Sequence, residues 1–320
     1  MAVSNRKKLF LCLDAFDTLF TPSIPIPTAY AHAASRHGIH VPSTQSLASS
    51  FKASFKQTSK NYPNYGKHTP VLSPEKWWGT IIESAFSPFL QPGQRVPEDL
   101  TRELLHHYSS RKGYSLFPDV SPFFDKLRRA KQQQQQPNDN WPWQTTITGI
   151  ITNSDDRVPG ILSSFGFKVA SRRHGTNSRT DDTSAQDPRG INSQDGQDID
   201  FVVLSYDVGF EKPHPRIFAA AEDILSDMLS KNAKKVGLGD VERELRVGEF
   251  EKLYVGDDLE KDYLGAREAG WDALFLRRDQ SSIESDAGGV RQIEVEGKDG
   301  KKRTVDSVCS LSDIASWRPG

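Results

Sequence analysis

Short apolar runs, separated by longer segments of helical or polar pattern, organise this chain. The runs cover Leu9–Leu13, Ile147–Ile151, Phe201–Leu204, Leu253–Val255 and Ala273–Leu276. Each is short and rich in aliphatic side chains, which is typical of a parallel strand buried on both faces. Strands of this kind that alternate with helical segments predict an α/β fold with a largely parallel sheet.

The long stretch between the first two runs has a helical pattern. Proline or glycine separates its helical segments, which are Ala29–His37, Gln45–Thr58, Pro74–Phe86, Pro97–Ser109 and Val120–Lys131. We expect a helical module at residues 21–114, inserted into a core made of residues 1–20 and 115–320. The module is either a lid over a site at the end of the first strand or a helical domain with no role there. Its position directly after that strand favours the lid.

Three segments contain few apolar residues. They lie near 132–145, where Gln132–Gln136 form a glutamine run, near 171–199 and near 278–306. Such segments gain too little from burial to offset their ordering entropy, so we expect polar surface insertions. In the third segment Ile293 and Val295 alternate with polar residues before a Gly–Lys–Asp–Gly turn, which allows a small β-hairpin.

Composition and charge narrow the classes of function. Hydrophobic residues make up 36% and charged residues 26% of the chain, which is enough apolar material for a sizeable core. Lys and Arg total 41 and Asp and Glu 42, and this balance argues against a partner that is a nucleic acid or an anionic membrane. Two cysteines, Cys12 and Cys309, cannot form a disulfide framework or a cysteine zinc site. Without a visible membrane span or signal-peptide pattern, we expect a cytoplasmic or nuclear protein.

Polar side chains follow the predicted strands at the point where each strand ends. In open α/β sheets ligands bind beyond the carboxyl ends of the strands, so these side chains are candidates for one site. They are Asp14, Asp17 and Thr18 after the first run, Thr152 and Asn153 after the second, Lys212 after the third, and Asp257, Asp258 and Asp262 after the fourth. Taken singly, each is explained as a turn residue, a cap or a solvated helix start. Their order along the chain favours a shared site.

Phosphoryl transfer is the chemistry that such a set allows. Asp14 is the candidate nucleophile. Asp257, supported by Asp262, brings further carboxylates that repel Asp14 unless a cation lies between them, and Mg²⁺ prefers oxygen ligands. Lys212 would neutralise the nucleophile and the phosphate, while Thr152 and nearby backbone N–H groups would hold phosphate oxygens.

Taken together, the motifs resemble those of the haloacid dehalogenase superfamily. The likeness is carried by Asp14–Leu19, by Thr152 after Gly149–Ile151, by Lys212 in Val208–Pro213, and by Val255–Asp258 with Asp262. The helical module stands where that family has its first-type cap. The resemblance implies a Rossmann-like core with a helical cap and Mg²⁺-dependent hydrolysis through an aspartyl-phosphate. A narrower likeness, to the branch of haloacid dehalogenase-like hydrolase domain-containing protein 3, lies in Tyr62–Gly66, Trp77–Trp78, Asp262–Gly265 and Ala269–Trp271.

The resemblance and the strand-end residues together give a site assignment. We expect Asp14, Lys212 and Thr152 to be catalytic, and Thr152, Asn153 and Thr18 to contact the substrate. We expect Asp14, the backbone carbonyl of Phe16, Asp257 and Asp262 to hold Mg²⁺. The expected partner is a small phosphate ester.

The sequence departs from the family's pattern at Phe16. Phosphatases of the superfamily usually carry a second Asp there, which protonates the leaving group and then activates water. General acid–base help of this kind is worth about 10²–10⁴-fold. Three alternatives stay open. The chain is a slow or leaving-group-restricted phosphatase, a 2-haloacid dehalogenase, or a binding protein on a disused hydrolase fold. Dehalogenases need no leaving-group acid, but their fourth motif is less acidic than Asp257, Asp258 and Asp262.

Overall fold

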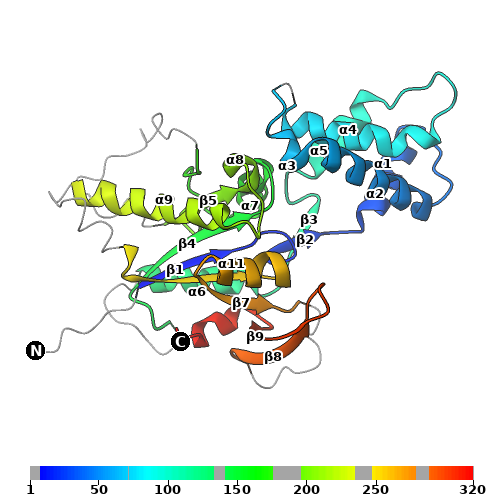
Figure 1. Ribbon diagram of the computed structural model, residues 1–320. Coiled ribbons are helices and arrows are strands. Elements are labelled where there is room, and N and C mark those ends of the chain that lie inside the picture. Colours follow the sequence, from blue (N-terminus) through cyan, green and yellow to red (C-terminus); the bar gives the residue numbers. More distant parts are fainter. Residues whose placement is uncertain are drawn as a thin grey trace, which may run out of the picture. The chain divides into compact units, whose positions relative to one another are not determined.

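The computed structural model describes residues 8–70, 72–132, 141–175, 196–234, 247–278 and 288–319. Contacts divide the chain into two compact units. Figure 1 shows the helices and strands of both, coloured along the sequence from blue at the N-terminus to red at the C-terminus. Unit 1 holds the residues up to Leu19, Leu116–Thr152 and those from Phe167 onward; unit 2 holds Phe20–Ser115 and Asn153–Gly166. Unit 2 therefore contains the helical module and, in addition, a segment that follows the second predicted strand.

In the described part of unit 1, seven strands form one sheet in the order β5-β4-β1-β6-β7-β9-β8. They are β1 (Lys8–Leu13), β4 (Thr145–Thr152), β5 (Phe201–Leu204), β6 (Phe250–Gly256), β7 (Asp272–Leu276), β8 (Arg291–Glu296) and β9 (Lys302–Val308). Neighbouring strands run parallel except β8 and β9, which are antiparallel. The α/β class and the five strands predicted from apolar runs are confirmed.

Helical elements cover this sheet. Those of unit 1 are α6 (Val120–Gln132), α8 (Ser205–Val208), α9 (Pro215–Lys234), the π-helix η2 (Leu259–Leu264), α11 (Gly265–Glu268) and the 3-10 helix η3 (Leu311–Ser316). On one face, Phe10 of β1 packs against Phe201 and Trp271, with ring centroids 5.3 Å away in both cases. Phe218 of α9 belongs to the same apolar cluster. Leu9 and Leu11, which alternate with Phe10 along β1, are also fully buried, so β1 has apolar surroundings on both faces.

Unit 2 is a helical assembly with a two-stranded sheet. Its elements are β2 (Phe20–Pro22), α1 (Ile26–Arg36), α2 (Thr44–Asn61), α3 (Pro63–Gly66), α4 (Pro74–Phe86), the 3-10 helix η1 (Ser87–Phe89), α5 (Glu98–His107), β3 (Tyr114–Leu116) and α7 (Arg157–Ser164). Ser43 and Ser73 cap α2 and α4 through their hydroxyl groups. Tyr30 packs against Phe86 in the core between the helices. The helices predicted from the periodicity are confirmed, with ends that shift by a few residues.

The third polar segment, near 278–306, was expected to be a surface insertion, and this is wrong for its described part. β8 and β9 pair as a hairpin, as the alternation suggested, and β9 also pairs with β7 in the main sheet. Val305 is almost fully buried, and Ile293 and Val295 pack against the core. A small share of apolar residues did not exclude packing here, because a strand needs apolar side chains only on one face.

The other two polar segments are packed at their ends. Trp141 and Trp143, inside the segment near 132–145, are buried, and Trp141 donates a hydrogen bond from Nε1 to Thr146. In the segment near 171–199, Asp198 is buried and pairs with Arg128 of α6. The description of these ends as unpacked insertions is therefore wrong, since aromatic burial and ion pairs hold them. Residues 133–140 and 176–195 lie outside the described residues.

Within the part of the chain that the structure describes, no helix is both long and apolar enough to cross a membrane.

Candidate active site

Three adjacent strands of unit 1 deliver polar residues to one edge of the sheet. β4, β1 and β6 are neighbours and run parallel, so their carboxyl ends meet. Thr152 is the last residue of β4, and Asp14 and Asp257 directly follow β1 and β6. The backbone N–H of Asp14 still donates to the carbonyl of Val255 at 3.0 Å, which fixes the two carboxylate-bearing segments side by side.

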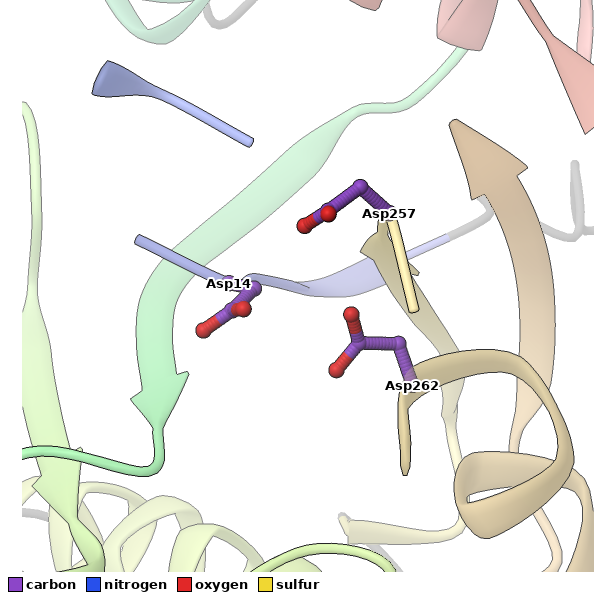
Figure 2. Close-up of side chains that lie close together, drawn as sticks. All are labelled: Asp14, Asp257 and Asp262. Carbon is purple, nitrogen blue, oxygen red and sulfur yellow. The ribbon is translucent and has the colours of Figure 1, made fainter. Parts of the chain in front are cut away.

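Three carboxylates converge at this edge. Figure 2 shows Asp14, Asp257 and Asp262 pointing toward the same space from three different elements. One carboxylate oxygen from each lies within 4.8 Å of the others, which is close enough for all three to ligate one metal ion. Gly256 makes this approach possible, because a Cβ there would lie 2.3 Å from Oδ2 of Asp262. The glycine before Asp257 is thus required by close packing rather than by its backbone angles.

Lys212 is buried between two of these carboxylates. Its Nζ lies 3.0 Å from Oδ1 of Asp14 and 2.6 Å from Oδ1 of Asp262, and its side chain is 1% exposed. It also donates to the hydroxyl of Tyr254 at 2.7 Å, and that hydroxyl donates to the carbonyl of Ile151. The ammonium group is therefore held in place by several elements, and it links Asp14, the nucleophile candidate, to Asp262.

The electrostatics of the site follow from burial and crowding. Burial alone lowers the pKa of Lys212, but the carboxylates of Asp14 and Asp262 outweigh burial and raise that pKa above its ordinary value. Burial, then the charges of Asp14 and Asp262, raise the pKa of Asp257 to about 7. Burial likewise raises the pKa of Asp262 to about 6, against the lowering effect of Lys212. The protein alone therefore holds more carboxylate charge in this space than Lys212 neutralises.

The side chain of Thr18 contacts Asp257. From the sequence, Thr18 was expected to contact the substrate. Its side chain is fully buried, and Oγ1 donates to Oδ1 of Asp257 at 3.0 Å, so its proton is already used. The carbonyl of Thr18 accepts a hydrogen bond from Nε of Arg278 at 3.2 Å. Arg278 also donates to Asp119 at 2.7 Å. No local pattern pointed to Arg278, because its two partners lie far away along the chain.

The remaining predicted site residues fall in different surroundings. Thr152 is 1% exposed at the end of β4. Phe16 is half-buried, and Asp17, with φ of 54°, is exposed. Asp258 caps η2, since its carboxylate accepts from the backbone N–H groups of Glu260 and Lys261, and it is not one of the three converging carboxylates.

Asn153 belongs to unit 2 and is held there by aromatic residues. The hydroxyl of Tyr65 donates to the carbonyl of Asn153 at 2.9 Å. Two residues further along, Asp155 accepts from Nε1 of Trp78 at 2.7 Å and pairs with Arg157 at 2.8 Å. The Asp155 side chain is fully buried, so it has exchanged water for these partners. This network, which the sequence did not reveal, explains why Asn153–Gly166 packs with the helical unit.

Several known proteins are similar to this chain over most of its length. No family model matches the chain. The chain is 29% identical over 270 residues to a putative uncharacterized hydrolase of Schizosaccharomyces pombe, covering 84% of this chain and 91% of that protein. It is 23% identical over 275 residues to haloacid dehalogenase-like hydrolase domain-containing protein 3 of Bos taurus, covering 86% of this chain and 84% of that protein. The chain belongs to the haloacid dehalogenase-like hydrolase superfamily.

A solved structure, that of a HAD phosphatase from Thermococcus onnurineus, aligns with a TM-score of 0.47 and 16% identity, covering 96% of this chain and 95% of that chain. In this haloacid dehalogenase-like hydrolase, the aromatic side chain of Phe16 stands two residues after Asp14. The side chain can neither donate nor accept a proton.

Proposed function

We propose that this haloacid dehalogenase-like hydrolase is a Mg²⁺-dependent phosphatase that acts on small phosphate esters and is restricted in its leaving groups. The observation that carries the proposal is the position of Lys212. Its ammonium bridges Asp14 and Asp262, and the carboxylate of Asp257 lies beside them. A nucleophilic carboxylate next to a fixed cation and two further carboxylates suits a reaction in which a doubly charged phosphoryl group is transferred.

The donor set fits a divalent cation. Asp14, Asp257 and Asp262 offer hard oxygen ligands, which Mg²⁺ prefers. Lys212 pairs with two of these carboxylates. For Asp257 the described residues provide one hydrogen-bond partner, the neutral hydroxyl of Thr18. Three carboxylates against one ammonium leave two negative charges, which a divalent cation would balance. We assign the ion to Asp14, Asp257 and the Phe16 carbonyl, with Asp262 in support. When bound, the ion also withdraws charge from the phosphoryl oxygens.

Asp14 performs the first chemical step in this proposal. One of its carboxylate oxygens attacks phosphorus, and an O–P bond forms while the bond to the leaving oxygen breaks with its electron pair. Lys212 stabilises the charge on the phosphoryl oxygens, and Thr152 with nearby backbone N–H groups orients them. Water then attacks the phosphorus of the aspartyl-phosphate, which releases inorganic phosphate and restores the Asp14 carboxylate.

Phe16 is the reason that we expect the choice of leaving group to be restricted. The leaving oxygen departs with an electron pair and has to take a proton from water, from the exposed carboxyl of Asp17 or from the substrate itself. Esters of acidic alcohols need this proton little, whereas alkyl esters need it strongly. We therefore expect activity to depend steeply on the pKa of the leaving group.

A Mg²⁺-dependent screen tests the proposal. Purified protein is assayed against aryl phosphates, alkyl phosphates and 2-haloacids, with and without Mg²⁺, and the Asp14→Asn variant serves as the blank. We expect phosphate release from aryl phosphates that needs both Mg²⁺ and Asp14. Halide release from 2-haloacids without added metal would show instead that the protein is a dehalogenase. Failure to hydrolyse any ester, with the protein folded, would favour the binding-protein alternative.

A further inference from the structure

Unit 1 contains a cavity that the assigned residues do not account for. Its volume is about 680 Å³, within the range of about 300–1,000 Å³ typical of small-molecule sites. Phe275, Ile293 and Val295 form its apolar part, and Arg277 and Arg278 line it as well. Two of these residues come from β8, so the hairpin that composition alone marked as a surface insertion supplies one wall.

The cavity adjoins the proposed metal site. Asp257 lines it and is also one of the three converging carboxylates. Asp17, which lines the cavity too, has a φ of 54°, a backbone conformation that is uncommon for a residue other than glycine. Strain of this kind concentrates at functional sites. A molecule in the cavity would therefore lie next to the place where phosphoryl transfer is proposed.

The two arginines differ in how they are engaged. Arg278 donates to Asp119 and to the carbonyl of Thr18, so its charge is already compensated. The guanidinium of Arg277 has no ion pair with any residue that the structure describes, while its backbone N–H donates to Val308 in the sheet. Arg277 is half-buried, so water screens its charge less than that of a fully exposed arginine. Asp17 and Glu294, two acidic residues that also line the cavity, are exposed, so water screens their repulsion of a bound anion more than it would screen that of a buried charge.

We propose that this cavity binds the leaving group of the substrate, and that the leaving group is an organic anion with an apolar body of aromatic size. The apolar body contacts Phe275, Ile293 and Val295, and a carboxylate or similar anion pairs with Arg277. The proposal rests on the proposed phosphatase function, because it takes the phosphoryl group to lie at Asp14. It assigns part of the substrate recognition to unit 1 and to the β8–β9 hairpin.

A matched pair of ligands tests this. The probes are 2-naphthyl phosphate and 6-carboxy-2-naphthyl phosphate, which differ by one carboxylate, and binding is measured by calorimetry with Mg²⁺ in the Asp14→Asn background, where turnover is blocked. One charge-assisted hydrogen bond predicts about tenfold tighter binding of the carboxylated probe. Adding Arg277→Gln should remove that difference and leave the affinity for 2-naphthyl phosphate unchanged. Adding Ile293→Ser should weaken both probes.

Arg129→Gln is the matched control, since Arg129 is an exposed arginine of α6 that does not line the cavity. It should preserve the difference between the probes. Equal affinity for the two probes before any change at Arg277, or a difference that survives Arg277→Gln, would overturn the cavity assignment. Hydrolysis of p-nitrophenyl phosphate by the wild-type protein is measured in parallel. A protein that hydrolyses no ester but binds the probes in an Arg277-dependent way would refute the phosphatase and keep the cavity as an organic-anion site.

Discussion

Replacing Asp257 by Asn should stabilise the metal-free protein and abolish its stabilisation by Mg²⁺. In the folded protein, burial and the charges of Asp14 and Asp262 raise the pKa of Asp257 from 3.8 to about 7. The unfolded chain ionises this carboxyl near its ordinary value. Between about pH 4 and pH 7 the unfolded state therefore releases a proton that the folded state retains, so stability falls as pH rises through that window. Asn has nearly the same shape, can still accept from Thr18, and carries no charge.

The size of the stabilisation by Asp257→Asn follows from the pKa shift of Asp257. A shift of about three pKa units corresponds to roughly 4 kcal/mol of unfolding free energy. Because Asp257 is partly exposed, we expect about 2–4 kcal/mol of stabilisation in Asp257→Asn above pH 7. At about pH 5 the gain should be about 1–2 kcal/mol, since the stability difference accumulates as pH rises from the unfolded to the folded pKa and only the lower part of that window has been crossed.

Urea unfolding of both proteins from about pH 5 to pH 8, in EDTA and in saturating Mg²⁺, measures the prediction. In EDTA the midpoint of Asp257→Asn should exceed that of the wild type, by more at high pH. In Mg²⁺ the wild type should gain stability by mass action, at about 2.7 kcal/mol for a concentration one hundred times the dissociation constant, and the variant should gain little. A variant that is destabilised in EDTA at high pH, or stabilised by Mg²⁺ as much as the wild type, would refute the reasoning.

Asp258→Asn is the matched control at the next position. Burial alone raises the pKa of Asp258, but hydrogen bonding to the Lys261 N–H and the charge of Lys261 outweigh it and lower that pKa. The linkage then has the opposite sign, and stability is lost as pH falls through the low folded value. Asp258→Asn should therefore give no stabilisation at high pH and should leave the Mg²⁺ effect intact.

Three further outcomes are expected. Phe16→Asp should raise kcat/KM for alkyl phosphates, by up to about 10²–10⁴-fold, far more than for p-nitrophenyl phosphate; a folded, Mg²⁺-binding variant that gains on neither substrate would contradict the acid-limited phosphatase. Trp78→Phe removes the hydrogen-bond donor to the buried carboxylate of Asp155 and should lower the unfolding free energy by about 1–3 kcal/mol, as measured by urea unfolding. An unchanged urea midpoint would show that this hydrogen bond contributes nothing to stability. Deleting residues 176–195, with a short Gly/Ser linker between the flanking residues, should leave the melting temperature nearly unchanged, because this polar segment has few apolar side chains to bury; a fall of more than about 5 °C would show that it packs.

Asp14 and Asp257, two of the three converging carboxylates, could be placed from the sequence because their positions depend on local pattern. An apolar run followed at once by a polar residue fixes both the strand and the residue at its carboxyl end, so Asp14 and Asp257 could be placed at one edge of a parallel sheet. The helices of unit 2 were found for the same reason, since apolar periodicity and proline or glycine breaks are properties of adjacent residues.

Composition was a weaker guide than periodicity. The segment near 278–306 is rich in polar residues, yet its alternating residues form two strands of the sheet and one wall of the cavity. Trp141 and Trp143 lie next to a glutamine run and are nevertheless buried. Whether such segments pack depends on which side chains reach a partner, and the proportion of polar residues does not report this.

Local sequence was sufficient for five strands of the sheet, for five of the helices, for the residues at the strand ends and for the missing carboxyl at Phe16, since each of these is encoded within a few neighbouring positions. The folded structure was needed to show that Lys212 joins Asp14 to Asp262, that Thr18 serves Asp257, and that Arg278 holds the Thr18 carbonyl. These pairs are separated by some 50 to 260 positions. Buried charges require partners that compensate them. The order of the strands in the sheet and the packing of the helices decide which distant residue supplies each partner, and no local pattern carries that information.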